Sequence, residues 1–324
     1  MMTRTIRATA LALFCSLAVS SCTAQVEKSG GGAQDAQAKA KAKNAAKKAK
    51  VRKQLLAALA KYDIVLDEKK KTLTIPVVVN APTNDLEFLL IHRIGKTHEA
   101  LLLTQAKPSI INVGLITIGL KKGQNASFKK KEPQPTEEQL KAGADPFILV
   151  PPSGQRVYIT VTFKAKDGKK ITRPVDDLLL DWHANTSVTN HQWIYLGERM
   201  AQMYRGEPPV YMADYEGNLI STCYKYPNNH IFTIEHERAR DEMNWSKTAD
   251  CPPPGTEMEL TFHAIKPPIV AAREVRMKRE AAERKKAGKG GKTDRPERNP
   301  AREGQPPPKK VPPPKKEEKK GGKI

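Results

Sequence analysis

Charge and apolar residues are distributed so unevenly along these 324 residues that only the middle of the chain is suited to building a hydrophobic core. Residues 1–61 carry 12 basic and 2 acidic side chains, and residues 269–324 carry 19 and 8. Residues 62–268 carry 25 of each kind and are therefore neutral. A segment of about 200 residues is long enough to bury a core as one domain. We therefore expect one globular domain over residues 62–268, between two basic flanking segments.

The first residues have the organisation of a secretion signal. Two arginines precede an apolar run over residues 8–19, which is shorter than the roughly 20 residues that a transmembrane helix needs. The sequence VSSC, ending at Cys22, resembles a bacterial lipobox, and cleavage after Ala24 is the alternative. We expect residues 1–21 to be a lipoprotein-type signal peptide. Lipidated Cys22 would then anchor an exported envelope protein to the membrane on its extracytoplasmic side, whereas cleavage after Ala24 would give a secreted protein.

Both flanking segments are basic and poor in large apolar side chains. Residues 22–61 are rich in Ala and Lys, and residues 269–324 begin with a charged helical pattern and end in repeated PPPKK. Such segments bury too little apolar surface to offset their ordering entropy, so we expect a partly helical linker and a charged helix followed by a disordered tail. They are either solvated arms or segments that adhere to anionic lipid or cell-wall polymers. Binding to nucleic acid is not expected of an exported chain with a neutral domain.

The neutral middle segment contains more strand patterns than helix patterns. Short alternating or β-branched runs predict strands, with an Asp-Gly hairpin turn at 167–168 and a Glu-Gly turn between two strands at 216–217. Ser109 and Gly123 are the expected start and stop of a helix that is buried on most sides. Residues 124–146 are polar and contain prolines, and they predict a long loop. The resulting expectation is an α+β fold with a mainly antiparallel sheet and one buried helix.

The stretch LEFLLIHRIGKTHEALLLTQAKPSIINVGLITIGLKKG, which starts at Leu86, resembles the signature of the YdjY domain, a bacterial family found in secreted or lipidated proteins. It combines an extended strand, a Lys-Thr-His-Glu step, a Lys-Pro pair and an apolar helix that ends in Gly-Leu-Lys-x-Gly. WIYLGERM, VYMADYEGNLIS and PPPGTEMELTFH are similar to later parts of the domain, so the resemblance covers about residues 63–265. It implies an exported protein and points to no particular reaction.

Two cysteines remain once the signal is removed. They are Cys223 and Cys251, an even pair in a chain that is expected to reach an oxidising compartment. We therefore expect a disulfide between them, which is worth roughly 3–4 kcal/mol in the chain-entropy model. The alternative is two inert buried thiols.

His98 and Glu99 are the candidate site residues because they lie inside the YdjY-like signature. They form either a functional site or a structural hydrogen-bond network. His98-Glu99 lacks the second histidine that a zinc-protease helix requires. Glu235 and Glu237 flank His236, but on a strand the histidine would face away from both. We therefore expect no metal site, no cofactor and no catalytic residue set.

Two hypotheses of function follow from the sequence. The first is a non-enzymatic envelope protein whose domain binds or scaffolds something at the cell surface while its basic segments adhere to anionic polymers. The second is an enzyme of unspecified reaction, including a metal-dependent one, centred on His98 and Glu99. Whether His98 lines a cleft beside other polar groups is the observation that separates them.

Overall fold

A computed structural model describes residues 31–287, with the exception of residues 84, 198, 226–227, 230 and 241. The expected signal peptide, Cys22 and the segment beyond residue 287 lie outside the described residues. The chain divides into two units, residues 1–52 and residues 53–324. Helix α1 (Gly31–Ala60) crosses this boundary, so its residues up to position 52 are considered by themselves.

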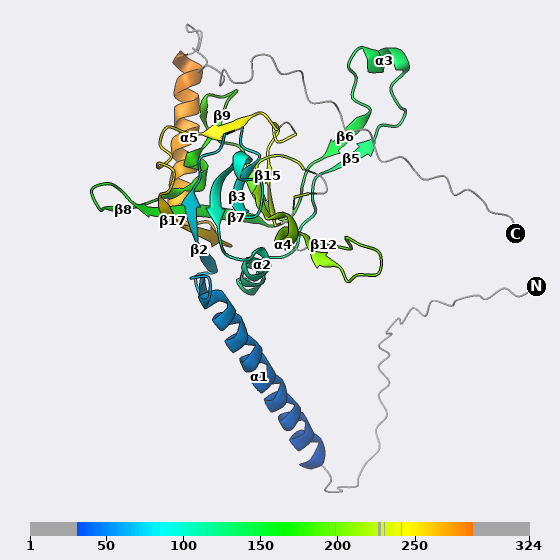
Figure 1. Ribbon diagram of the computed structural model, residues 1–324, viewed down its shortest axis with the longest axis vertical. Coiled ribbons are helices and arrows are strands. Elements are labelled where there is room, and N and C mark those ends of the chain that lie inside the picture. Colours follow the sequence, from blue (N-terminus) through cyan, green and yellow to red (C-terminus); the bar gives the residue numbers. More distant parts are fainter. Residues whose placement is uncertain are drawn as a thin grey trace, which may run out of the picture. The chain divides into compact units, whose positions relative to one another are not determined.

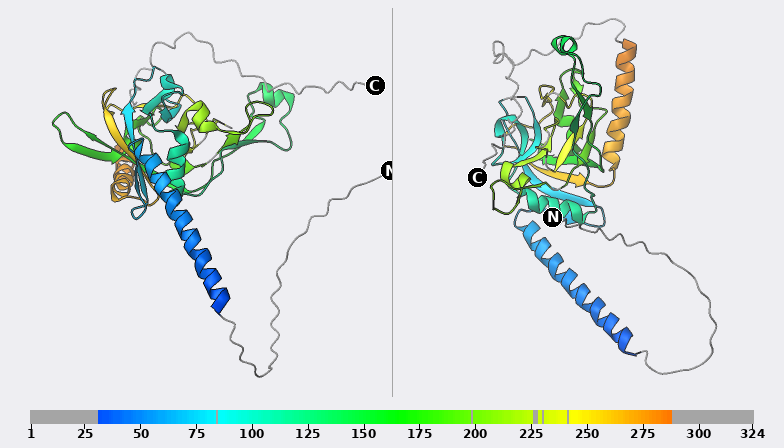
Figure 2. Two further views of the ribbon diagram at one scale, coloured as in Figure 1. Left: turned by 60° about the horizontal axis from the view of Figure 1, so that its bottom comes forward. Right: turned by 90° about the vertical axis from the view of Figure 1, so that its right-hand side faces the viewer.

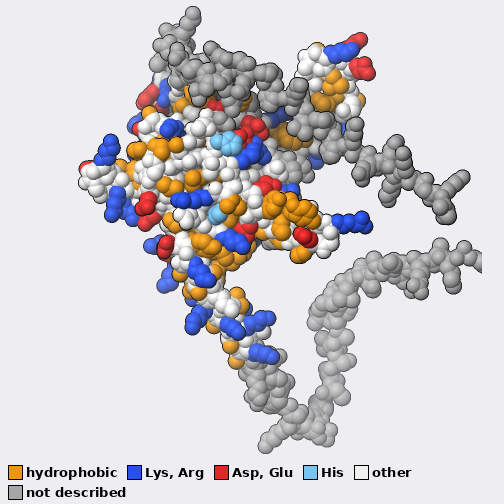
Figure 3. Space-filling model, in the orientation of Figure 1, with side chains coloured by type: hydrophobic (Ala, Val, Ile, Leu, Met, Phe, Trp, Pro, Cys, Tyr) orange, Lys and Arg blue, Asp and Glu red, His pale blue; other side chains and the backbone are white. Residues whose placement is uncertain are grey.

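Helix α1 is cationic over most of its described surface. Residues 41–54 are all exposed, and Figure 3 shows lysine and arginine side chains along this part of the helix. Ala and Lys favour the helix by intrinsic propensity, because their side chains lose little freedom in it. The last turns differ, since Leu59 is buried in the core of the second unit and Leu55 packs against that core.

Eight strands of the second unit close into a mixed β-barrel (Figure 1). Around the barrel they are β2 (Thr72–Val79), β17 (Glu257–His263), β7 (Arg156–Lys164), β11 (Gln192–Tyr195), β15 (Phe232–Glu235), β14 (Asn218–Ser221), β3 (Phe88–His92) and β4 (Ala100–Thr104). β4 pairs with β2 and closes the ring, and the pairs β14–β15 and β3–β4 are parallel. The α+β prediction is confirmed. The sheet differs from the predicted, mainly antiparallel one in two respects. It is mixed, and it closes into a barrel.

The barrel core follows the alternation of the strands. In β17, Met258, Leu260 and Phe262 are buried while the residues between them are exposed or half-buried, as the period of two along a strand requires. Phe262 stacks on Phe232 across the interior with ring centroids 5.1 Å apart. Such offset aromatic pairs add to the free energy gained from burying their area.

The ring closes at a short seam along the edge of β2. The first half of β2 pairs with β1 (Val65–Asp67), whereas only Val78 and Val79 pair with β4. Between them lies Pro76, which has no N–H to give to a neighbouring strand. The hydroxyl of buried Thr104 donates to the carbonyl of Pro76 at 2.9 Å and accepts the Ala106 N–H at 3.1 Å. A side chain therefore supplies the hydrogen bond that the strands do not make here.

Helix α2 (Pro108–Thr117) begins close to the predicted start but is capped differently. Its N-cap residue is Lys107, and the Ser109 N–H donates to the carboxylate of Asp214 at 2.8 Å. The predicted Ser109 cap is therefore wrong, because a carboxylate from another element satisfies the free N–H. The helix is also less buried than expected, since Val113 and Ile116 are exposed.

Two other segments correct the sequence expectations. Residues 212–216, expected to be part of a strand, form the short helix α4 (Met212–Glu216), which ends at Gly217 with φ of 79°. Glycine adopts this left-handed conformation without a steric penalty. The expected loop at 124–146 contains strand β5 (Ser127–Lys130) and helix α3 (Glu137–Lys141), in which Thr136 forms a capping box with Gln139.

The remaining elements are short, except for the last helix. They are η1 (Thr97–Glu99), β6 (Phe147–Val150), β8 (Lys170–Pro174), η2 (Val175–Leu178), β9 (Leu179–Asp181), β10 (Thr186–Ser187), β12 (Met200–Ala201), β13 (Val210–Tyr211), β16 (Trp245–Lys247) and α5 (Pro268–Ala287). The predicted hairpin around residues 167–168 is confirmed as β7–β8. After β8, the chain forms the single 3-10 turn η2 and then β9.

Helix α5 lies alongside the barrel next to β8 (Figures 1 and 2). Val270 and Arg273 in its first turns are buried. Among the described helices, none combines the length and the apolar character needed to cross a membrane.

Candidate functional site

His98 and Glu99 lie in the 3-10 turn η1, immediately before β4. The side chain of His98 is 53% exposed, and its Nε2 atom lies 3.4 Å from Oε1 of Glu99. The side chain of Glu99, in contrast, is largely buried, with 15% of it exposed. The two neighbours in the signature therefore have different environments, and Glu99 is the one held inside the structure.

Glu99 meets a second buried carboxyl group, that of Glu87. Because β3 and β4 are parallel neighbours, the residues just before them lie side by side, and the Glu87 N–H donates to the Glu99 carbonyl at 3.0 Å. Burial and the hydrogen bond to Glu99 raise the pKa of Glu87. Burial also raises the pKa of Glu99, but its bonds to Glu87 and Lys96 outweigh this effect and lower it. The two carboxyl groups therefore shift each other's pKa in opposite directions.

Two lysines compensate the charge of this pair. Lys225 contacts Glu87 and pairs with Glu242 at 2.9 Å, and only 13% of its side chain is exposed. Lys96 lies 3.3 Å from Glu99 and 3.7 Å from Glu87. This arrangement, the Glu87–Glu99 pair, can hold and release a proton, but its carboxylates are already neutralised by neighbours.

Cys223 and Cys251 are free thiols, so the predicted disulfide is wrong. Cys223 is buried after β14, with its sulfur 3.8 Å from the carbonyl of Glu87. Cys251 follows β16, and the charged residues that act on its thiol are Lys247 and Arg173. The two residues therefore pack against different elements. Burial raises the pKa of both thiols, that of Cys251 to about 11, which makes them poor nucleophiles at neutral pH.

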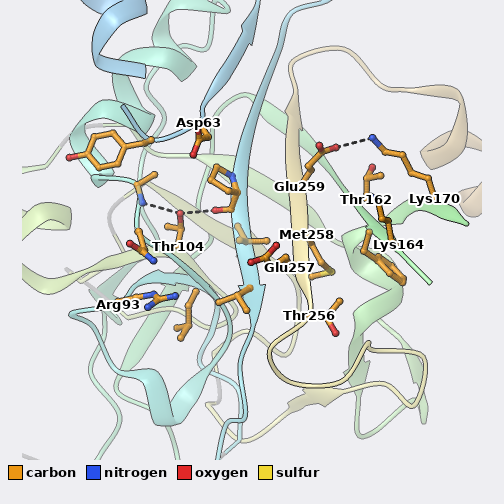
Figure 4. A pocket seen from close by; sticks show the side chains of 18 of the residues that line it. Asp63, Arg93, Thr104, Thr162, Lys164, Lys170, Thr256, Glu257, Met258 and Glu259 are labelled. Atoms are coloured by element: carbon orange, nitrogen blue, oxygen red, sulfur yellow. Dashed lines mark hydrogen bonds and ion pairs between the residues drawn. The ribbon is translucent and has the colours of Figure 1, made fainter. Parts of the chain in front are cut away.

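One cleft lies over the seam of the barrel and has a volume of about 860 Å³. Figure 4 shows its mixed lining, with Glu259 paired to Lys170 at 3.2 Å and the hydrogen bonds of Thr104 on the other side. Asp63, Arg93 and Glu257 add charges of both signs. A lining of this kind favours no single charge type in a ligand.

Another cleft, of about 520 Å³, lies between α5 and the neighbouring strands, and we refer to it as the α5 cleft. Its lining includes His191, whose Nε2 atom lies 2.5 Å from Oδ1 of Asp176, with both side chains buried. No pattern in the sequence indicates this pair. Its members are in η2 and just before β11, and no local motif joins them.

Glu235, His236 and Glu237 do not form a metal site. β15 ends at Glu235, and His236 is buried edge-on to Trp245 with ring centroids 5.1 Å apart. Burial lowers the pKa of His236, which disfavours its charged form. Within the described part of the chain, no group of three or more His, Cys, Asp or Glu side chains is arranged to hold a metal ion.

The model of the YdjY domain family matches residues 64–263 of this chain. The chain belongs to the YdjY domain family. The resemblance predicted over about residues 63–265 is thereby confirmed. The YdjY match contains the whole barrel and both carboxyl groups of the Glu87–Glu99 pair, whereas α5 follows it in the sequence. Searches of curated proteins and of solved structures found no match.

Proposed function

We propose that this YdjY protein is an exported envelope protein, anchored by lipidated Cys22, whose barrel is a binding or scaffolding domain. Its basic segments adhere to anionic lipid or cell-wall polymers. The observation that carries the proposal is the separation of charge. The neutral segment 62–268 contains most of the described fold, and the excess of lysine and arginine lies in the segments on either side.

Helix α1 supports an adhesive role through its surface. Between residues 39 and 53 it has eight basic side chains and no acidic one, and residues 41–54 are exposed. Its apolar residues before Leu55 are alanines apart from Val51, so it has no apolar face to insert into a bilayer. Such a helix attracts an anionic surface from any side.

The later turns of α5 offer a second cationic surface. Arg279 is exposed, as are Arg284, Lys285 and Lys286 near the end of the described chain. Each cation near anionic lipid contributes about 1 kcal/mol, and at physiological salt the attraction decays over about 8 Å. A dozen such cations can therefore sum to strong, salt-sensitive binding without any pocket.

Vesicle binding of the mature chain tests the adhesive part of the proposal. Binding to vesicles with anionic lipid should fall steeply between about 0.05 M and about 0.5 M salt, because counterions screen each contact. A variant with lysine-to-glutamine changes on α1 should lose most of this binding. The changed positions are Lys41, Lys43, Lys47, Lys48, Lys50 and Lys53.

The matched control carries the same number of changes at exposed lysines of the barrel unit. Its positions are Lys121, Lys122, Lys129, Lys130, Lys166 and Lys169. This control should retain its binding. Equal losses in the two variants, or binding that does not respond to salt, would contradict the proposal. For the anchor, Cys22→Ser should release the protein from the membrane fraction of cells, and unchanged fractionation would exclude lipidation as the anchor.

One observation favours the second function, an enzyme centred on His98 and Glu99. The Glu87–Glu99 pair combines a carboxyl group of raised pKa with a carboxylate of lowered pKa, which is the combination that general acid–base catalysis uses. A screen of chromogenic esters and glycosides with the purified chain tests it. Turnover that Glu99→Gln abolishes, while the variant remains folded, would support this function over the first.

A further inference from the structure

The α5 cleft contains a buried histidine with one unused ring nitrogen. Nε2 of His191 donates to Oδ1 of Asp176 at 2.5 Å, and the Trp193 indole N–H donates to the same oxygen at 2.8 Å. The side chain of His191 is 7% exposed, and its Nδ1 atom has no hydrogen-bond partner among the described residues. A buried polar atom without a partner costs about 1–3 kcal/mol. His191 is one of the residues that line the cleft, so this atom calls for a partner that the described residues do not supply.

Asp176 determines which ring nitrogen of His191 is free. Burial raises the pKa of Asp176, but its interactions with His191, Arg273 and Trp193 outweigh this effect and lower the pKa to about 2. An ionised carboxylate accepts hydrogen bonds only, so it keeps a proton on Nε2. In the neutral ring, Nδ1 is then left as a hydrogen-bond acceptor.

The same cleft contains a seat for a carboxylate. Arg156 and Lys266 both lie over the ring of Tyr158, at 5.0 Å and 5.5 Å from its centroid. Both also pair with Glu274 of α5, Arg156 at 3.1 Å and Lys266 at 2.7 Å. Two cations held by one aromatic ring thus converge on a single carboxylate, which the chain itself supplies.

Arg156 connects the two halves of the cleft. The nitrogen that pairs with Glu274 also donates to the carbonyl of His191 at 3.4 Å. The carboxylate seat and the free ring nitrogen therefore lie on neighbouring parts of one lining. A cleft of about 520 Å³ lies within the 300–1,000 Å³ typical of small-molecule sites.

We propose that the α5 cleft binds small carboxylates that carry a hydroxyl or amine group. The ligand's carboxylate replaces that of Glu274 between Arg156 and Lys266, and its hydroxyl or N–H group donates to Nδ1 of His191. Glu274 acts as an internal competitor. α5 need not leave the barrel for this exchange, because Arg273 holds the helix separately through Asp177 at 2.6 Å. The site is independent of the adhesive role proposed for the basic segments.

Titration calorimetry of the mature chain tests the proposal with lactate, glutamate and glucuronate as probes. Their uncharged counterparts lactamide, glutamine and glucose are the controls. At least one acid should bind with a Kd below about 10 mM, and about tenfold more tightly than its counterpart, because charge-assisted hydrogen bonds are the stronger ones. If glucuronate binds, an oligosaccharide ending in glucuronate tests whether the site takes a free acid or the end of a polymer.

Three variants give the proposal its sharpest test. Glu274→Gln should tighten binding of the acid several-fold, since the competing charge is lost, whereas Arg156→Gln should weaken it about tenfold. Glu280→Gln is the matched control on the same helix. Glu280 does not line the cleft and pairs only loosely with Arg276, at 3.8 Å. It should leave the affinity unchanged.

Nitrogen NMR of the histidine rings reports on His191 without any substitution. The bound acid should shift the Nδ1 signal of His191, because that atom gains a hydrogen-bond donor. The proposal is overturned if no acid binds more tightly than its counterpart, or if Glu274→Gln and Glu280→Gln behave alike. A His191 signal that is unmoved at saturation would overturn it as well.

Discussion

Replacing Arg273 should destabilise the protein even though the YdjY match ends ten residues earlier, at residue 263. Arg273 is 6% exposed and its guanidinium makes three hydrogen bonds. It donates to Asp177 Oδ1 at 2.6 Å, to the Ser187 hydroxyl at 3.1 Å and to the Val188 carbonyl at 2.9 Å. Arg273→Met keeps much of the side-chain volume and removes all three donors.

The expected loss in the free energy of unfolding depends on the groups that lose Arg273 as their partner. Breaking a buried ion pair by removing one partner costs about 3–5 kcal/mol. Here Asp177 keeps Arg276 at 3.2 Å, and the Ser187 hydroxyl is free to rotate toward another partner. We therefore expect Arg273→Met to lower the free energy of unfolding by about 2–4 kcal/mol.

Urea unfolding followed by tryptophan fluorescence measures this loss. Arg276→Met is the matched control, since Arg276 contacts the same carboxylate but is 49% exposed, and exposed pairs contribute at most about 1 kcal/mol. Hydrogen exchange should show faster exchange of the first α5 amides in Arg273→Met. The double variant with Asp177→Asn should lose less than the sum of its single changes, because it leaves no unpaired buried charge.

A loss below about 1 kcal/mol in Arg273→Met, or losses that are equal in the two arginine variants, would refute this reasoning. The burial of Arg273 would then be incidental, and α5 would be a freely detachable segment. Unchanged exchange of the first α5 amides would lead to the same conclusion.

Three further predictions concern single side chains. Alkylation of the unfolded, unreduced protein should modify both Cys223 and Cys251, because both are free thiols; mass spectrometry showing either one protected would contradict this. Asp176→Asn should remove about 2–3 kcal/mol of stability at neutral pH, and the difference from the parent should shrink as pH falls from 3.8 toward about 2, where the depressed pKa of Asp176 lies. Thr104→Val should cost about 1–3 kcal/mol in urea unfolding, because it leaves the Pro76 carbonyl and the Ala106 N–H at the seam without their partner.

Local patterns in the sequence predict the parts of this fold that local forces determine. The alternation of residues 156–164 and the Asp-Gly pair after them predict the β7–β8 hairpin, and Gly168 adopts φ of 81° in its turn. Closure of the barrel is a different matter. It rests on Val78 and Val79 meeting β4, a contact for which no short-range pattern exists.

Tertiary contacts also override two local expectations. Ser109 is a good N-cap residue by propensity, but the carboxylate of Asp214 takes that role across 105 positions of sequence. The segment 212–216 is followed by a glycine that suits a strand turn as well as a helix end. The left-handed Gly217 ends helix α4 instead.

The candidate sites divide in the same way. The signature around His98 indicates Glu99 directly, and the register of β3 and β4 adds Glu87 only when the sheet is known. The pair of His191 and Asp176 bridges 15 positions between η2 and β11, and it gives no spacing that a motif could use. The Glu87–Glu99 pair and the His191–Asp176 pair could therefore be identified only from the folded structure.

Two adjacent residues of η2 link the cleft to the basic helix. Asp176 accepts from buried His191, while Asp177 next to it holds Arg273 of α5. The first turns of α5 therefore attach the helix to the barrel, whereas the cations from Arg279 onward are exposed and can contact other molecules. It follows that changes in the later turns should alter adhesion without altering stability, whereas changes at Arg273 should alter stability first. The two proposed roles of this helix are then separable by experiment, because different turns carry them.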